Sequence, residues 1–400
     1  MVIGQLDRGG CERHVQEMTI ALNERGFECV VFAFRRGGEL QESLEMSGVR
    51  VLSPVHHSRG WFGVFRTAQC LWSNLQRERP DILHFFLPEA YLLGGLVSFA
   101  APPCVRLMSR RSLNHYQRKR WYARPLERFL HMRMDGVLAN SQAVSRDLAA
   151  EGIPEGSRHV IYNGVRTLPA SSDAQKISAR RLLRVREDQL VMVMVANLLP
   201  YKGHGDVLEA LRRVRGRLPK SWLVIMIGAD RGLASDLKST VAQFGLERNV
   251  RWEGVVTDVF PYLEAADLAL NASHEEGFSN AVLEAMAAGL PQIVTNAGGN
   301  PEAITNGEHG LVVEPADPAG LGEAIASLAN DAQKRLAMGR AARERARESF
   351  SVEATVSSYA TLYTSLTGGH FRDPDPPPRS VGQVLWPSTQ VGCLAPFSSR

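Results

Sequence analysis

Short apolar runs alternate with helical stretches along most of the chain, and no other feature constrains the fold as strongly. A strand of a parallel sheet is buried on both faces and therefore appears as a continuous apolar run. Strands that alternate with helices build a sheet covered by helices, with ligand sites at the carboxyl ends of the strands. The pattern predicts strands at 2–6, 29–34, 49–52, 81–86, 104–108, 136–139 and 159–162, and again at 190–195, 222–227, 250–252, 268–271, 292–295 and 310–313.

A polar, turn-rich stretch at 167–173 separates the two series of strands and is typical of a linker. It predicts two doubly wound α/β domains, an N-terminal one at 1–170 and a C-terminal one at 171–350, followed by a helix at 351–366. Residues 367–400 are rich in Ser, Gly and Pro and show no sustained periodicity, so they are expected to form a mostly disordered tail.

Composition excludes several other classes of protein. Apolar residues make up 44% of the chain and charged residues 22%, which is the balance of a globular protein. The net charge of +4 favours phosphate-bearing partners without requiring a nucleic acid. The five cysteines form no CxxC pair, and no leader or membrane span is apparent, so we expect a cytoplasmic location. The histidines form no ligand set, and Asp373 and Asp375 lie in a proline run, so no metal site is predicted.

The densest chemical signal is the segment SHEEGFSNAVLEAMAAGLP at 273–291. A predicted strand precedes a loop with Glu276 and Gly277, and a helix is expected to begin at about Ser279. The first amides of a helix have no intrahelical partners and carry partial positive charge, which makes them a site for phosphate. Glu284, about one turn further on, can accept hydrogen bonds from a neighbouring diol. Together these features suit a nucleotide diphosphate.

The run from Glu276 to Glu284, which ends in EAMAAGLP, resembles the signature of the family-4 glycosyltransferases, retaining enzymes of the GT-B fold. The resemblance covers most of 1–366 and implies two facing Rossmann-like domains with an interdomain cleft. It implies that Glu276 lies at the donor sugar, that Glu284 binds the ribose hydroxyls, and that Lys202 binds the diphosphate. Asn197 stands where the family commonly has an arginine, so one charge at the diphosphate is missing or is supplied elsewhere.

The same resemblance assigns further residues of the second domain to the donor. Gly254 begins a segment that resembles the loop cradling the nucleobase. Backbone without a Cβ can approach a ligand closely, and Gly298-Gly299 resembles the donor-side glycine turn, with a purely structural turn as the alternative. Asn300 is expected to cap the helix that follows. The implied donor-binding residues are Glu284, Lys202, Asn197, Gly277, Phe278, Ser279, Asn280, Gly254, Gly298 and Gly299.

In the first domain, Gly9 and Gly10 resemble a glycine loop that faces donor and acceptor. His84 matches a histidine common in the family and joins Glu276 and Lys202 as an implied catalytic residue, with a hydrogen-bonded core histidine as the alternative. A second active-site histidine found in many members is absent here, so Ser109 or Arg110 is expected to line the acceptor side instead. The resemblance also implies that the helix at 351–366 crosses back to the first domain.

Two other functions stay open on the sequence alone. An NADP-dependent oxidoreductase lacks its G-x-G-x-x-G fingerprint here, although Arg35-Arg36 after the second predicted strand could meet a 2′-phosphate. A catalytically silent nucleotide-sugar-binding protein agrees with the departures at Asn197 and Ser109.

The favoured prediction is a retaining, metal-independent glycosyltransferase of the hexosyltransferase type. It would move a sugar from a UDP- or GDP-sugar, its co-substrate in place of any cofactor, to a glycan or lipid-linked acceptor in cell-surface polysaccharide or glycolipid synthesis. The segment 106–133 mixes basic and aromatic residues, which predicts peripheral docking on the anionic inner face of the membrane, with a solvated basic helix face as the alternative. No nucleic-acid partner is expected.

Overall fold

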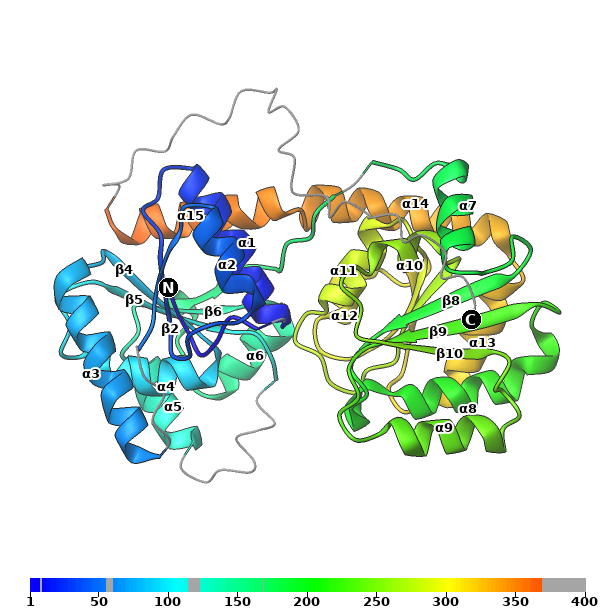
Figure 1. Ribbon diagram of the computed structural model, residues 1–400, viewed down its shortest axis with the longest axis horizontal. Coiled ribbons are helices and arrows are strands. Elements are labelled where there is room, and N and C mark those ends of the chain that lie inside the picture. The colour runs from blue at the N-terminus through cyan, green and yellow to red at the C-terminus, as the bar shows by residue number, and fades with distance from the viewer. Residues whose placement is uncertain (8, 55–59, 114–122, 168, 369–400) are drawn as a thin grey trace, which may run out of the picture.

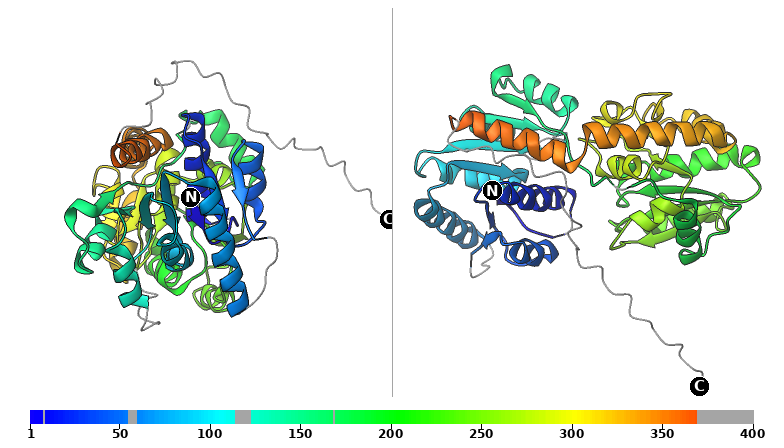
Figure 2. Two further views of the ribbon diagram at one scale, coloured as in Figure 1. Left: turned by 90° about the vertical axis from the view of Figure 1, so that its left-hand side faces the viewer. Right: turned by 90° about the horizontal axis from the view of Figure 1, so that it is seen from above.

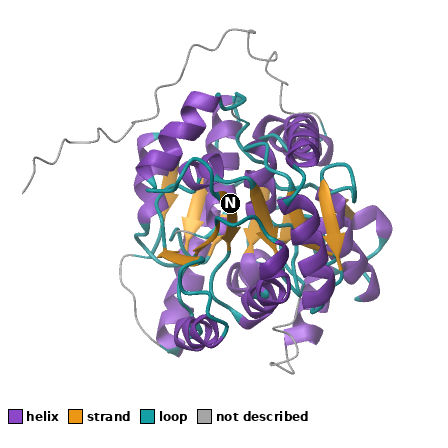
Figure 3. Cartoon of the chain, turned by 90° about the vertical axis from the view of Figure 1, so that its right-hand side faces the viewer, coloured by secondary structure: helices purple, strands orange, loops and turns teal. Residues whose placement is uncertain are grey.

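The computed structural model describes residues 1–7, 9–54, 60–113, 123–167 and 169–368. These residues form two parallel sheets that stand side by side, with helices on both faces of each sheet (Figures 1 and 3). The prediction of two Rossmann-like domains in a GT-B arrangement is confirmed. The predicted tail lies outside the described residues from 369 onward.

The first sheet has the strand order β3-β2-β1-β4-β5-β6-β7 among the described residues. Each strand pairs in parallel with its neighbours, so all carboxyl ends lie at one edge. The elements are β1 (Val2–Ile3), α1 (Gly10–Glu24), β2 (Val30–Ala33), α2 (Glu39–Met46), β3 (Arg50–Leu52), α3 (Trp61–Glu78), β4 (Ile82–Phe86), α4 (Leu87–Ser98), β5 (Val105–Arg110), α5 (Ala123–His131), β6 (Gly136–Ala139), α6 (Gln142–Ala150) and β7 (Arg158–Val160).

The second sheet has the order β10-β9-β8-β11-β12-β13 within the described chain. Its central strand β8 (Leu190–Val195) reads LVMVMV, and both faces of it are packed by buried apolar side chains. The other elements are α7 (Asp173–Leu182), α8 (His204–Val214), β9 (Trp222–Ile227), α9 (Ala234–Gln243), β10 (Val250–Gly254), α10 (Phe260–Ala265), β11 (Leu268–Asn271), α11 (Asn280–Ala287), β12 (Gln292–Thr295), α12 (Asn300–Ala303), β13 (Gly310–Val313), α13 (Pro318–Ala329) and α14 (Ala332–Ser349).

The last helix, α15 (Val352–Leu366), leaves the second domain and lies along the first (Figures 1 and 2). Its buried Tyr359 and Tyr363 join the core cluster that α1 and β4 build. The Tyr359 hydroxyl lies 3.3 Å from Nε2 of His14 on α1. The first domain therefore completes its core with a segment from the far end of the chain.

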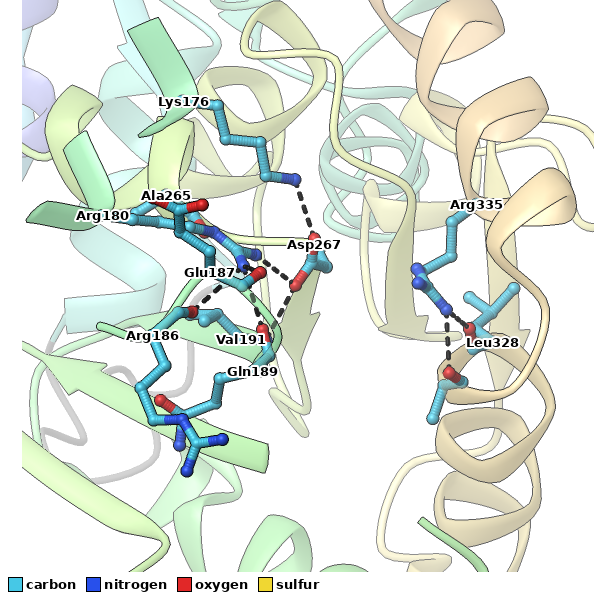
Figure 4. A network of polar contacts seen from close by, with 11 residues as sticks. Lys176, Arg180, Arg186, Glu187, Gln189, Val191, Ala265, Asp267, Leu328 and Arg335 are labelled. Carbon is cyan, nitrogen blue, oxygen red and sulfur yellow. Dashed lines mark hydrogen bonds and ion pairs between the residues drawn. The ribbon is translucent and has the colours of Figure 1, made fainter. Parts of the chain in front are cut away.

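Helix α7 begins inside the predicted linker and is fixed to the second sheet by one buried arginine. Ser172 caps α7 in a capping box with Gln175. Arg180 donates to the carbonyl of Ala265 and to the carboxylate of Asp267, over 3.0 and 2.6 Å (Figure 4). Asp267 also accepts from the backbone amide of Val191 at the start of the neighbouring strand. This network holds α7 against the amino ends of β8 and β11, away from the other domain.

Several local expectations are wrong. Strand β1 ends at Ile3 rather than at 6, and β10 continues to Gly254, two residues beyond its predicted end at 252. Strand β5 runs on to Arg110, two residues beyond its predicted end at 108. Asn300 does not cap α12, because Gly299 occupies the N-cap position and the Asn300 amide group points inward, donating to the carbonyl of Thr295. No helix in the described part of the chain combines the length and the apolar composition that a membrane crossing requires.

Candidate active site

The amino ends of two helices, one from each domain, face each other across the interdomain cleft. Helix α1 begins at Gly10 after the glycine loop that follows β1, and α11 begins at Asn280 after β11. The Asn280 side-chain amide donates to the Gly10 carbonyl over 3.3 Å. A Cβ on Gly10 would lie 3.2 Å from that amide nitrogen, so glycine permits the approach. No side chain caps α11, so the amides of its first turn favour an anion in this region, whereas the start of α1 already holds the Glu12 carboxylate.

Lys202 and Glu276 meet at the start of α11. The Lys202 ammonium lies 2.6 Å from the Glu276 carboxylate, and both side chains are largely buried, with 18% and 14% of their surfaces exposed. Lys202 ends a short 3-10 turn after β8, and Glu276 lies in the loop after β11. The two loops are joined again where the His274 amide donates to the Tyr201 carbonyl over 2.7 Å. A cation and an anion are thus fixed side by side where the loop after β11 leads into α11.

The loop that carries Glu276 is held by glycines that allow backbone to touch backbone. Gly298 adopts φ +53°, and a Cβ there would collide with the Glu276 carbonyl oxygen. Gly299 donates its amide to the Gly277 carbonyl over 2.9 Å. On its other side, a Cβ on Gly277 would collide with the carbonyl of Arg111 in the first domain. The Gly298-Gly299 turn therefore positions the Glu276 loop. This is the purely structural role that stands as the alternative to donor binding.

Glu284 lies on the wall of an interdomain pocket of about 520 Å³. Its carboxylate forms a 3.1 Å ion pair with Arg13 on α1 of the other domain. Burial raises the pKa of Glu284 to about 7, while Arg13 opposes the shift and the carboxylates of Glu17 and Asp258 add to it. The lining combines α1, α2, α11, the segment after β7 and the segment after β10: Arg13, Gln16, Glu17, Ile20, Ser43, Gly164, Val165, Arg166, Thr257, Asp258, Val259, Phe260, Asn280 and Glu284.

The structure places His84 in the core of the first domain. It is 1% exposed, and its ring nitrogens lie 2.6 Å from the Tyr363 hydroxyl and 2.8 Å from the Ser109 hydroxyl. Its ring stacks on Phe86 with centroids 4.2 Å apart. Burial holds the pKa of His84 well below its ordinary value. This is the geometry of a hydrogen-bonded core histidine, the alternative to a catalytic role. Neither ring nitrogen of His84 is directed to a sugar-acceptor site.

The prediction that Arg110 lines the acceptor side is wrong. Its guanidinium is 2% exposed and forms ion pairs with Glu151, at 2.8 Å, and with Glu127, at 3.4 Å. Successive side chains of a strand point to opposite faces of the sheet, so Ser109 turns to His84 and Arg110 turns to α5 and α6. Ser109 is also buried, at 3% exposure.

Two residues that are predicted to bind the donor also support nearby backbone. The side-chain oxygen of Asn197 accepts from the Ala229 amide over 2.9 Å and thereby links the loops after β8 and β9. Gly254 adopts φ +65° at the end of β10, and its carbonyl accepts from the Gly228 amide. A Cβ on Gly254 would meet open space, so the glycine serves the backbone angle.

Sequence reasoning missed Arg111 as a residue of the cleft. Its guanidinium donates to the side-chain oxygen of Asn163 over 2.6 Å, and Asn163 donates to the side-chain oxygen of Asn280 over 2.6 Å. A chain of hydrogen bonds thus leads from this arginine to the start of α11. The extra length of β5 explains the error, because the residue that leaves the strand at the cleft is Arg111 rather than Ser109.

Glu302 joins the two domains beside the site. Its carboxylate accepts from the backbone amides of Gln142 and Ala143, at 2.7 and 2.8 Å, in the first turn of α6. An acidic side chain that accepts hydrogen bonds from the unpaired amides at a helix start makes a favourable, charge-assisted contact. Nothing in the linear order of the chain, in which 159 residues separate Ala143 from Glu302, indicates this contact.

Sequence models of two families match the two halves of the chain. The model described as glycosyl transferases group 1 matches residues 175–345, and the model described as Glycosyltransferase Family 4 matches residues 8–167. The chain is 27% identical to the glycogen synthase of Mycobacterium tuberculosis over 92% of its own length and 94% of the relative's. It is 30% identical to the D-inositol 3-phosphate glycosyltransferase of Corynebacterium efficiens over 47% of its length and 46% of the relative's.

Solved structures share the whole fold. HepE of Anabaena, solved in complex with UDP, superposes with a TM-score of 0.80 at 23% identity, covering 91% of this chain and 98% of that one. Sucrose-phosphate synthase of Thermosynechococcus elongatus superposes with a TM-score of 0.76 at 19% identity, covering 92% and 98%.

Proposed function

The chain belongs to the group 1 glycosyltransferases of the GT-B fold, and from that premise we propose that it transfers a sugar, with retention of anomeric configuration, from a UDP- or GDP-sugar. The observation that carries the proposal is the contact of Lys202 with Glu276 at the start of α11. The pocket that contains Glu284 adjoins it through Asn280. UDP is bound in the structures of HepE, a protein of the same fold, which supports a nucleotide-sugar donor.

In this proposal the diphosphate replaces Glu276 as the partner of Lys202. The ammonium and the first amides of α11 then hold the charge of the diphosphate, since preorganised donors are most effective where charge develops. Glu276, released from its ion pair, accepts hydrogen bonds from hydroxyls of the donor sugar. The nucleoside extends into the 520 Å³ pocket, where Glu284 accepts from the ribose diol.

The transfer step follows from this placement. No carboxylate is assigned as a covalent nucleophile, so we favour front-face substitution. The acceptor oxygen bonds to the anomeric carbon while the bond from that carbon to the diphosphate oxygen breaks. The departing oxygen takes the acceptor's proton, and Lys202 stabilises the remaining negative charge. The proposed chemistry needs no metal, and turnover is expected to persist in EDTA.

Arg111 is proposed to supply the charge that Asn197 lacks. It reaches the start of α11 through Asn163, from the first domain rather than from the loop after β8. The diphosphate would then lie between cations of both domains, Lys202 on one side and Arg111 on the other. Replacement of Arg111 by Gln is expected to raise KM for the donor, and Asn197→Arg in that variant is expected to recover part of the loss.

Donor binding and the stereochemistry of transfer test the proposal. A thermal-shift panel of UDP, GDP and ADP with their sugar conjugates identifies the base, because a ligand that binds only the folded state raises the melting temperature. The anomeric proton of the product, followed by NMR, reports the configuration. Lys202→Ala and Glu276→Gln should strongly lower the rate of transfer, with the exposed Lys238→Ala as a matched control. Inversion at the anomeric carbon, or turnover that requires Mn²⁺, would contradict the mechanism.

An oxidoreductase is not favoured. Both matching family models describe glycosyltransferases. Arg35, which that alternative needs for a 2′-phosphate, forms a 2.9 Å ion pair with Glu89. The acceptor is proposed to be a glycan or a lipid-linked glycan of the cell surface, met by a peripheral protein at the inner face of the membrane.

A further inference from the structure

We propose that the exposed aromatic face of helix α3 docks the protein on the surface of an anionic lipid bilayer. The first turns of α3 expose Trp61, Phe62 and Phe65 by 89%, 81% and 69%, and Trp72 further along by 45%. Single exposed apolar residues are normal on a protein surface, but a contiguous group of large ones marks an interaction site.

The spacing of these residues places them along one side of the helix. Trp61 and Phe65 are four residues apart, and Trp72 follows seven residues later, so all three lie on one stripe at 3.6 residues per turn. Leu71 and Leu75 are buried on the side that faces the sheet. The aromatic stripe borders this buried side, so α3 carries more apolar surface than its packing against the sheet uses.

The charges of α3 select a membrane as the partner. Helix α3 carries two arginines, Arg66 and Arg77, and one acidic residue, Glu78, whose carboxylate is paired with Arg50, so the face is weakly cationic as well as aromatic. Arg66 is exposed within the aromatic group. Tryptophan and phenylalanine prefer the interface between headgroups and acyl chains, and nearby arginines are attracted to anionic lipids.

The segment 106–133, to which sequence reasoning assigned docking, offers less of such a surface in its described part. Arg106 donates to the carbonyl of Ser98, Arg110 is buried in ion pairs, and Arg111 lies in the cleft. Residues 114–122 of that segment lie outside the described residues. Phe129 and Met132 of the segment are 43% and 64% exposed and lie near the exposed Arg128 and Arg133, but the exposed aromatic group at the start of α3 is larger, so we assign the docking to α3.

The position of α3 suits a transferase that takes its acceptor from a membrane. It follows β3, and in a parallel sheet every helix that follows a strand begins at the edge where the carboxyl ends lie. That edge carries Gly9, Gly10 and Arg111 of the cleft. The inference deepens the proposed peripheral location and rests on it, but its test needs no donor and no transfer activity.

Sedimentation of the full chain with lipid vesicles tests the assignment. Wild-type protein is expected to bind vesicles that contain about a third phosphatidylglycerol and to bind pure phosphatidylcholine more weakly. The double variant Trp61→Ser with Phe65→Ser should lower the partition coefficient by about tenfold or more, since two large apolar side chains no longer enter the interface. Arg66→Gln should weaken binding to the anionic vesicles only.

A matched control removes exposed apolar side chains elsewhere. Leu182→Ser with Leu336→Ser replaces side chains that are 72% and 55% exposed in the second domain, and it should leave vesicle binding unchanged. Circular dichroism and an unchanged melting temperature show that the α3 variant is folded. Equal binding by the α3 variant and wild type would overturn the assignment, as would a wild-type dimer that the variant converts to monomer without any binding to vesicles.

Discussion

Lys202 and Glu276 form an ion pair in the cleft, so the loss of either one changes the charge presented to the donor. We expect Lys202→Ala to lower kcat/KM by the factor that corresponds to a loss of about 2–4 kcal/mol of transition-state stabilisation. The reason is that a preorganised donor to the departing oxygen is lost. Steady-state kinetics with Lys238→Ala as control measure this. A change in KM alone, with kcat preserved, would mean that Lys202 binds the ground state and the transition state equally.

Glu284 makes stability depend on pH. Its pKa is raised from 4.5 to about 7 by burial, so the folded protein holds this proton more tightly than the unfolded chain does. The stabilisation is full below pH 4.5 and is lost as the pH rises through 7, by about 3 kcal/mol at most. Urea unfolding at pH 5 and pH 8 should show a smaller difference for Glu284→Gln than for the wild type, and an unchanged one for the exposed Glu247→Gln.

Single side chains show what the sequence predicts at this scale. Lys202 and Glu276 each lie in a loop that follows a strand, as the sequence predicts. Arg110 could not be predicted, because its orientation depends on strand alternation in β5 and its partner Glu151 lies 41 residues further along. The partner of Glu284, Arg13, belongs to the other domain, and no local pattern connects the two.

At the scale of elements, the turn at Gly298 sets the position of the loop after β11. We expect Gly298→Ala to destabilise the protein by about 1–3 kcal/mol, because alanine is strained at φ +53° and its Cβ would collide with the Glu276 carbonyl. Donor affinity and kcat should fall as well, since Glu276 must shift. Chemical denaturation and kinetics measure both effects.

Gly307 provides the matched control for that substitution. It has φ +84°, but a Cβ there would meet nothing within 4 Å. Gly307→Ala should therefore show the backbone strain alone and normal turnover. If the two variants lose the same stability and neither loses activity, close approach at Gly298 does not position the loop.

Elements whose apolar run stands out from the turn residues around it were predicted well, and elements without such a run were not. Strands β8, β9, β11, β12 and β13 have their predicted bounds because each is an apolar run between turn residues. Helix α14 gave no such signal. It is rich in charged residues, and apart from Met338 the side that it buries consists of small residues, namely Gly339, Ala342 and Ala346.

At the scale of the whole molecule, Glu302 holds the second domain to the first turn of α6. We expect Glu302→Ala to weaken this association by about 1–2 kcal/mol, because two helix-start amides lose a charged acceptor. Small-angle scattering should show a larger radius of gyration for the ligand-free variant, and the exposed Glu247→Ala should match the wild type. An unchanged radius in Glu302→Ala would show that other contacts hold the domains together.

The return of α15 to the first domain also bears on synthesis at the ribosome. The hydroxyl of Tyr359 meets His14 across 345 residues of chain, and Tyr363 meets His84 across 279. At about 5–20 residues per second, roughly 15–70 seconds of translation separate the emergence of α1 from that of the helix that covers it. During that interval the nascent first domain exposes an apolar groove, so we expect it to be a substrate for ribosome-associated chaperones until the final helix docks.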